Sequence, residues 1–128
     1  MSSTWKYIKR TLDDASTIRG DVYAFETPSK RKQPFVTFFL TELEPEFTID
    51  KASPIDLETW VFISSDNKVG DAIINADAIR TLIDHTSGTA DNVTIKQALM
   101  LGRSIPIVEE DAQGDKIFQV IDEYQFRV

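Results

Sequence analysis

The sequence predicts an α+β fold for residues 1–128: two main helices on one face of a single antiparallel or mixed β-sheet that ends in a long C-terminal β-hairpin. Three observations predict it. Two segments have apolar residues at helical spacing, and several others alternate with the period of a strand. The length of 128 residues suits one hydrophobic core but not two. A single sheet with both helices on one face therefore accommodates the order of elements.

Two segments are predicted to be helices because their apolar residues share one face. In residues 4–14 this stripe consists of Trp5, Ile8, Leu12 and Ala15. In residues 66–84 it consists of Val69, Ile73, Ala76, Ile79 and Ile83. A hydroxyl among residues 2–4 is expected to cap the first helix, and Ser65 or Asp66 the second. The polar run 86–92, which contains Gly88, is expected to end the second helix.

Two strands are predicted before the second helix. Residues 35–41, rich in aromatic and β-branched side chains, predict a central strand after a short extended piece at 22–25. Strand pairing is expected to lapse over residues 42–46, which carry charge and a proline. In the next strand, 55–63, Asp56 and Glu58 are expected to face water, whereas Trp60 and Phe62 are expected to be covered.

The C-terminal third predicts a long hairpin. Residues 93–107 and 117–128 both alternate between apolar and polar side chains, and the polar segment 109–115 between them contains Gly114 for a turn. Pro106 lacks an N–H group, so it is expected at a sheet edge or a bulge.

Residue types argue against catalysis. The chain has no cysteine and one histidine, His85, which lies at the predicted end of the second helix, where a cation suits the helix dipole. The five glycines are scattered, so no glycine-rich phosphate loop is present. No metal or cofactor motif is found, and we expect a protein that is not an enzyme. A hydrolase with two carboxylates brought together by folding remains an open alternative.

Charge and hydropathy restrict the partners. The net charge of −7 disfavours binding to nucleic-acid phosphates. No apolar run approaches the roughly 20 residues that span a bilayer. The first ten residues lack the apolar core of a signal peptide, so we expect an intracellular origin without membrane association.

Two segments are candidate protein-interaction sites. Lys30, Arg31 and Lys32 form a basic cluster, either a solvated loop tip or a docking patch for an acidic partner. The acidic segment that follows the first long strand contains Glu44, Glu46 and Phe47. Phe47 is either an interface anchor or a side chain tucked onto its own core.

Several segments resemble tail terminator, or tail-completion, proteins of long-tailed bacteriophages. The likeness begins with Val22-Tyr23, then Pro28 and the run Gln33-Pro-Phe-Val-Thr-Phe38. It continues through residues 47–50, 55–62, the helix segment 71–82 and the final strand 122–128. The resemblance covers most of residues 5–128 at the level of pattern.

This resemblance implies a structural protein of the virion, at the head-proximal end of the tail and assembled in the bacterial cytoplasm. It implies a homo-oligomeric, hexameric ring that ends growth of the tail tube. Its partners would be the tail tube protein and the head connector, with DNA passing through and no cofactor. The alternative is a non-enzymatic intracellular adaptor or inhibitor that binds its partner through an exposed sheet edge.

Overall fold

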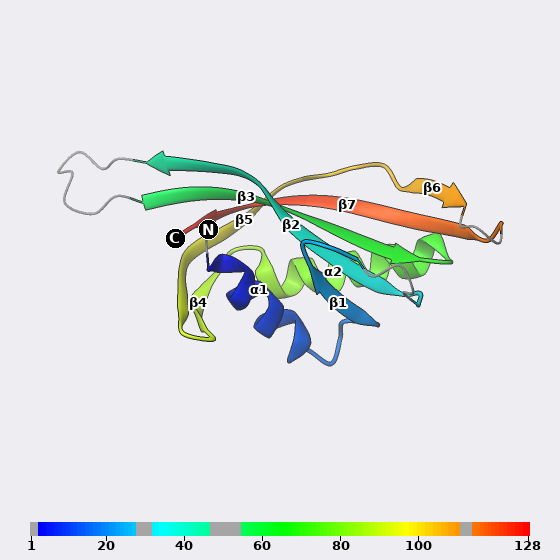
Figure 1. Cartoon of the computed structure of the whole chain (residues 1–128), viewed down its shortest axis with the longest axis horizontal. Helices are drawn as coiled ribbons and strands as arrows, with labels where there is room; N and C mark the ends of the chain where they lie inside the picture. The colour runs from blue at the N-terminus through cyan, green and yellow to red at the C-terminus, as the bar shows by residue number, and fades with distance from the viewer. Residues whose placement is uncertain (1–2, 28–31, 47–54, 111–113) are drawn as a thin grey trace.

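The computed structural model describes residues 3–27, 32–46, 55–110 and 114–128. Its two helices are α1 (Thr4–Asp13) and α2 (Val69–Ile83). Its strands are β1 (Asp21–Ala24), β2 (Phe35–Glu46), β3 (Ile55–Asp66), β4 (Thr86–Ala90), β5 (Val93–Arg103), β6 (Ile107–Glu110) and β7 (Lys116–Arg127). The predicted α+β class is confirmed (Figure 1).

The strands form one seven-stranded sheet in the order β1-β2-β3-β7-β5-β4, with β6 also paired to β7. β1 is parallel to β2, whereas the other pairs are antiparallel, so the sheet is mixed. The long C-terminal hairpin is confirmed, because β5 and β6 both pair with β7. Its first arm is divided at residues 104–106, where Pro106 cannot donate a ladder hydrogen bond.

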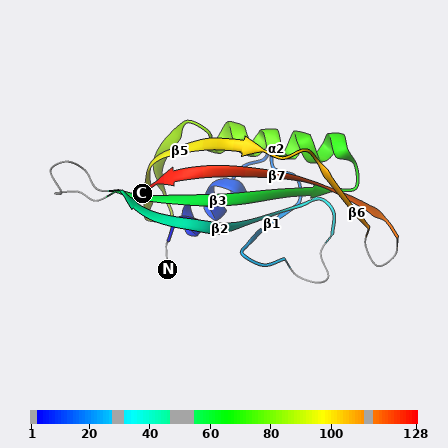
Figure 2. The same cartoon turned by 90° about the horizontal axis from the view of Figure 1, so that it is seen from above.

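Both helices lie on the same face of the sheet, below the strands in Figure 1. The sheet curls, so that α1 contacts both β1 and β4, the strands at its two ends. Viewed from above in Figure 2, the long strands run side by side across the helices. We call the opposite side of the sheet the helix-free face.

The core lies between the helices and the sheet, and Trp60 on β3 is at its centre. Trp60 is fully buried, and its ring lies 5.8 Å from that of Phe25 and 5.9 Å from that of Phe38. The indole Nε1 donates a 2.9 Å hydrogen bond to Oε1 of Glu58. The prediction that Glu58 faces water is therefore wrong. Glu58 is 2% exposed, and its carboxylate accepts the hydrogen bond from the buried indole of Trp60.

β2 is longer than predicted. The expected lapse over residues 42–46 is wrong, because the pairing with β3 continues to the Glu46–Ile55 pair, past a register shift between Leu40 and Glu42. β1 pairs only with residues 35–38 of β2. Beyond Phe38, β2 is therefore an edge strand with β3 as its only partner in the described sheet. A proline such as Pro45 is tolerated on an edge strand, where its missing N–H faces away from the sheet.

The start of α2 and the strand that follows α2 also differ from expectation. Ser65 and Asp66 belong to β3, and the N-cap of α2 is Lys68, which makes no side-chain capping bond. Val69, expected on the buried stripe, is the first residue of the helix and is 40% exposed. The polar run after the helix contains β4, joined to β5 by Asp91 and Asn92. Both have positive φ, which tight hairpin turns require.

α1 also begins without the expected side-chain cap. Ser3 occupies the N-cap, but its hydroxyl makes no capping bond; its carbonyl instead accepts a 3.0 Å hydrogen bond from the N–H of Lys6. Ala15 lies beyond the end of the helix, so the buried face consists of Thr4, Tyr7, Ile8 and Leu12.

Gly20, between α1 and β1, is the glycine at which a side chain should be least tolerated. Its φ is +78°, and an added Cβ would overlap the carbonyl oxygen of Pro34. We expect Gly20→Ala to lower the free energy of unfolding by more than the about 1–2 kcal/mol that left-handed backbone alone costs. Urea denaturation measures this. Gly114 is the control, with φ +82° and no atom of the described residues near the added Cβ: Gly114→Ala should show only the backbone cost. Equal losses would contradict the Pro34 overlap.

Candidate interaction surfaces

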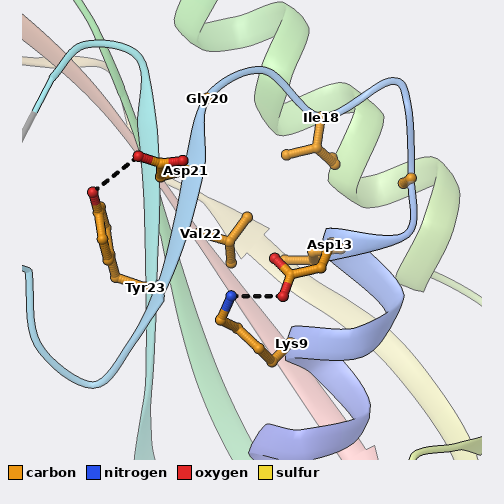
Figure 3. Close-up of a pocket in the computed structure, with 9 residues that line it drawn as sticks. Lys9, Asp13, Ile18, Gly20, Asp21, Val22 and Tyr23 are labelled. Atoms are coloured by element: carbon orange, nitrogen blue, oxygen red, sulfur yellow. Dashed lines mark hydrogen bonds and ion pairs between the residues drawn. The ribbon is translucent and has the colours of Figure 1, made fainter.

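A surface hollow of about 570 Å³ lies between the last turn of helix α1 and strand β1 (Figure 3). Its floor is apolar, with Leu12, Ile18 and Val22, and its rim holds the 2.6 Å ion pair between Lys9 and Asp13. On its far side the Tyr23 hydroxyl donates to Asp21, and desolvation together with the Asp21 charge raises the pKa of Tyr23. The residues that line the hollow include no histidine or serine.

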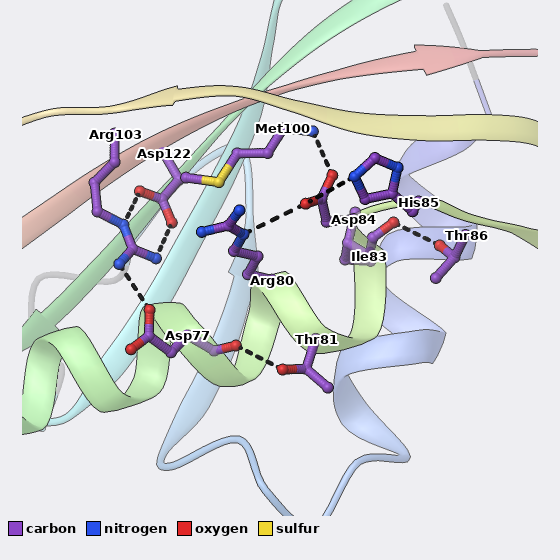
Figure 4. Close-up of polar contacts among 10 residues, drawn as sticks. All are labelled: Asp77, Arg80, Thr81, Ile83, Asp84, His85, Thr86, Met100, Arg103 and Asp122. Carbon is purple, nitrogen blue, oxygen red and sulfur yellow. Dashed lines mark hydrogen bonds and ion pairs between the residues drawn. The ribbon is translucent and has the colours of Figure 1, made fainter.

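A network of charged residues joins α2 to the sheet (Figure 4). Arg103 on β5 donates two hydrogen bonds, of 2.8 and 3.0 Å, to the carboxylate of Asp122 on β7. A third, of 2.7 Å, reaches Asp77 on α2. The hydrogen bonding to Asp122 raises the pKa of the Arg103 guanidinium, so it stays charged. Because Asp122 is 1% exposed, this arrangement holds two strands and a helix together rather than presenting a reactive group.

The end of α2 is fixed by Asp84 and Thr86. Oδ1 of Asp84 accepts a 2.8 Å hydrogen bond from the N–H of Met100, and the Thr86 hydroxyl donates to the carbonyl of Ile83. His85 follows with φ +59°, and its side chain is 77% exposed, with Nε2 3.7 Å from Asp84. The histidine therefore lies at the helix end, as expected, beside a carboxylate.

Asp84 should make stability depend on pH in the acid range. Burial raises its pKa, but the Met100 N–H, Arg80 and His85 outweigh burial and hold the pKa below the ordinary 3.8. A carboxyl with a lowered folded-state pKa contributes stability that is complete above pH 3.8 and is lost as pH falls through the folded value.

We therefore expect the melting temperature of Asp84→Asn to lie below that of the wild type throughout the range from about pH 5 to 8. The difference in melting temperature between the two proteins should become smaller as the pH falls below 3.8, the ordinary pKa of an aspartate. Thermal melts of both proteins across this range test it. A gap that widens on acidification would contradict the direction of the shift.

The sequence-predicted interaction residues do not come together in the described structure. Lys32 is exposed just before β2, whereas Lys30, Arg31 and Phe47 lie outside the described residues. Glu44 and Glu46 form the far end of β2, paired with Leu57 and Ile55. Glu44 lies nine positions after Phe35 along the strand, a span of roughly 30 Å at about 3.3 Å per residue. The basic and acidic candidates therefore belong to opposite ends of β2.

The structure shows an exposed apolar edge that sequence analysis did not single out. We define the β6 edge as residues 105–110. Ile105 is 87% exposed, Ile107 42% and Val108 51%, and Leu101 nearby on β5 is 53% exposed. In the sequence these residues have the pattern of an ordinary hairpin strand. Pro106 was the one indication that this segment lies at a sheet edge or a bulge.

A second hollow, of about 300 Å³, opens on the helix-free face. It is lined by aromatic and small polar side chains: Phe25, Thr27, Phe35, Thr37, Phe39, Ile63, Ser65 and Gln119. Phe35 and Val61 on this face are 3% and 7% exposed although no described helix covers them. Phe35 and Val61 are thus buried without a described helix above them, whereas the β6 edge exposes its apolar side chains, as α2 does at Ile74, 59% exposed.

Two further features were sought among the described residues: a metal-ligand cluster and a membrane-spanning helix. They contain no cluster of three or more histidines and carboxylates able to hold a metal. None of their helices is both long enough and apolar enough to cross a bilayer. The molecule is thus an α+β protein whose distinctive features are a curled mixed sheet, helices on one face and an apolar strand edge.

Comparison with known proteins finds a likeness of fold. Neither the family models nor the curated proteins searched include a match. Among solved structures, the fold is similar to a chain in the virion of a native gene transfer agent particle, with a TM-score of 0.63. The similarity covers 94% of this chain and 90% of the other, at 10% sequence identity. It shows that the two chains share a fold over nearly their whole length.

Proposed function

We propose that this chain is a structural protein of a phage-like particle that caps the head-proximal end of the tail tube. As a ring of identical copies it ends tube growth and offers the surface that joins the head. The observation that carries the proposal is the fold shared, over 94% of the chain, with a component of a virion-like particle.

The surfaces described above suit a capping role. The chain presents an apolar strand edge and an uncovered sheet face, which allow contacts with neighbours on more than one side. Capping is stoichiometric: a ring that occupies the last position of the tube blocks the next tube subunit. The net charge of −7 would let DNA pass without adhering, because phosphates are repelled by an acidic protein.

Deleting the gene from the particle-producing strain tests this proposal. We expect lysates to contain tails of abnormal length, or tails unattached to heads, in negative-stain electron micrographs. Supplying the wild-type gene in trans should restore normal particles. Normal tails joined to heads in the deletion lysate would contradict the capping function.

The β6 edge also favours a second candidate, a non-enzymatic adaptor or inhibitor that binds one partner protein by adding a strand. Affinity capture from a host that produces no particles separates the two functions. A single stoichiometric partner and no virion proteins would favour the adaptor, whereas capture of virion proteins only from particle-producing cells would favour the cap.

A further inference from the structure

We infer that the β6 edge of one copy adds to strand β1 of a second copy, so that the sheet of one chain continues into the sheet of the next. The inference rests on the proposed ring and identifies the two surfaces that join neighbouring copies. We define the β1 surface as strand β1 together with the hollow between β1 and α1.

The β6 edge is an open strand edge with apolar side chains. Within the described sheet β6 pairs with β7 alone, and all four of its residues are exposed. Ile107 lies opposite Gln119, which lines the hollow on the helix-free face, so the next residue, Val108, projects to the helix side. Both sides of the edge therefore carry apolar surface in water, and such an edge is a template for a further strand.

The β1 surface is open in a complementary way. β1 ends the described sheet on the other side and pairs with β2 alone. The hollow of about 570 Å³ runs beside it on the side of α1 (Figure 3), and its floor holds Leu12, Ile18 and Val22. A strand added to β1 would thus find a free sheet edge and, on its helix side, an apolar hollow to fill.

The other open edges of the described sheet suit β6 less well. The later half of β2 carries Glu42, Glu44 and Glu46, which oppose the acidic pair Glu109 and Glu110 on β6. A symmetric contact between two β6 strands would bring the same acidic pairs together. β4 contains no large apolar residue. β1 is therefore the edge left for an apolar and acidic strand.

Charge also favours the β1 surface. Lys9 lines its hollow, and Arg19 lies two residues before β1 with a side chain that is 45% exposed. Both cations also pair with acids of their own chain. Glu109 and Glu110 would thus approach a surface that contains cations, whereas along the later half of β2 the charged side chains are all acidic.

Register places the two surfaces at the same height. One transverse row of the sheet runs from Asp21 through Phe35, Ser65 and Gln119 to Ile107. Copies related by rotation alone meet at equal height when their strands run along the ring axis. Ile107 of one copy then lies opposite Asp21 of the next. Because the two surfaces are different, the contact is head-to-tail, the kind that can close into a ring.

Strand direction makes the contact antiparallel. β1 is parallel to β2, and so is β7, because each of the pairs β2–β3 and β3–β7 is antiparallel. β6 runs opposite to β7 and therefore opposite to β1. An antiparallel register through the row above sets Val108 opposite Gly20 and Pro106 opposite Val22. These two apolar side chains then face the hollow, whose floor they would cover.

Engineered disulfides test the contact, because the chain has no cysteine. The double variant Asp21→Cys with Ile107→Cys replaces two exposed residues, and in the deletion strain it should assemble normally in the reducing cytoplasm. Oxidation of the purified particles should then link copies into a ladder of species, seen on non-reducing gels, that ends at one closed oligomer. A second pair, Tyr23→Cys with Ile105→Cys, tests the same register two residues further along and replaces the first if that variant does not assemble.

The matched control combines Ile107→Cys with Leu43→Cys, which lies on the competing edge of β2 and is 53% exposed. A disulfide requires Cβ atoms within about 4.5 Å, so we expect at least about tenfold more linked chain in the test variant than in the control. Equal or greater linking in the control would overturn the inference. Each single-cysteine protein should stay unlinked, and self-linking of Ile107→Cys would overturn the inference in favour of a symmetric edge.

The same particles separate a failure of this contact from a failure of the proposed function. Particles that contain the double variant but leave it unlinked after oxidation would overturn the contact, while the capping function would stand. Particles that lack this chain would instead reject the capping function, and the inferred contact with it.

Discussion

Replacing Arg103 by methionine is expected to lower the free energy of unfolding by about 3–5 kcal/mol. The substitution leaves the carboxylate of Asp122, 1% exposed, without the two hydrogen bonds that Arg103 donates. An uncompensated charge under the sheet is costly because water cannot reach it. Chemical denaturation followed by tryptophan fluorescence measures the loss.

Two further variants test whether the buried charge is the cause. Asp77→Asn removes only the exposed partner of Arg103, 58% exposed, and should cost no more than about 1 kcal/mol. Combining Arg103→Met with Asp122→Leu removes both partners of this ion pair, and should recover most of the stability lost in the single variant. A double variant as unstable as Arg103→Met would contradict this explanation.

Truncating Trp60 to alanine should also destabilise the protein by about 3–5 kcal/mol. Its side chain is fully buried beside Phe25 and Phe38, and its removal leaves a cavity in the core. The surrounding rings belong to separate strands and loops, so they cannot collapse fully into the space. Thermal and urea denaturation both measure the change.

Leu43→Ala is the matched control for Trp60→Ala, because Leu43 is 53% exposed on the edge half of β2. It should change the free energy of unfolding by no more than about 0.5 kcal/mol. Comparable losses in the two variants would show that the core does not lie where the structure places it.

The long elements could be predicted from sequence because their periodicity is strong. α2 and the alternating residues of β7 were identified within a few residues of their bounds. Predictions from local composition were wrong where contacts with other segments of the chain determine the structure. β2 continues through an acidic segment containing Pro45, since β1 leaves that half as an edge. Glu58 is buried because the indole of Trp60 reaches it.

The interaction surfaces were predicted less well than the fold. Sequence charge drew attention to Lys32, and the structure confirms that it is exposed. The β6 edge escaped notice, because the exposure of Ile107 and Val108 depends on β7 being the only strand that pairs with β6 in the described sheet. Pairing order is set by contacts between distant segments, and local patterns do not contain it.

Locating the chain in assembled particles tests the central claim most directly. We expect cryo-electron microscopy of purified particles to show a ring of this fold between the tail tube and the head connector, with helices and curled sheet matching Figure 1. Density for this fold repeated along the whole tube, confined to the distal tip, or missing from the particle would contradict a head-proximal cap.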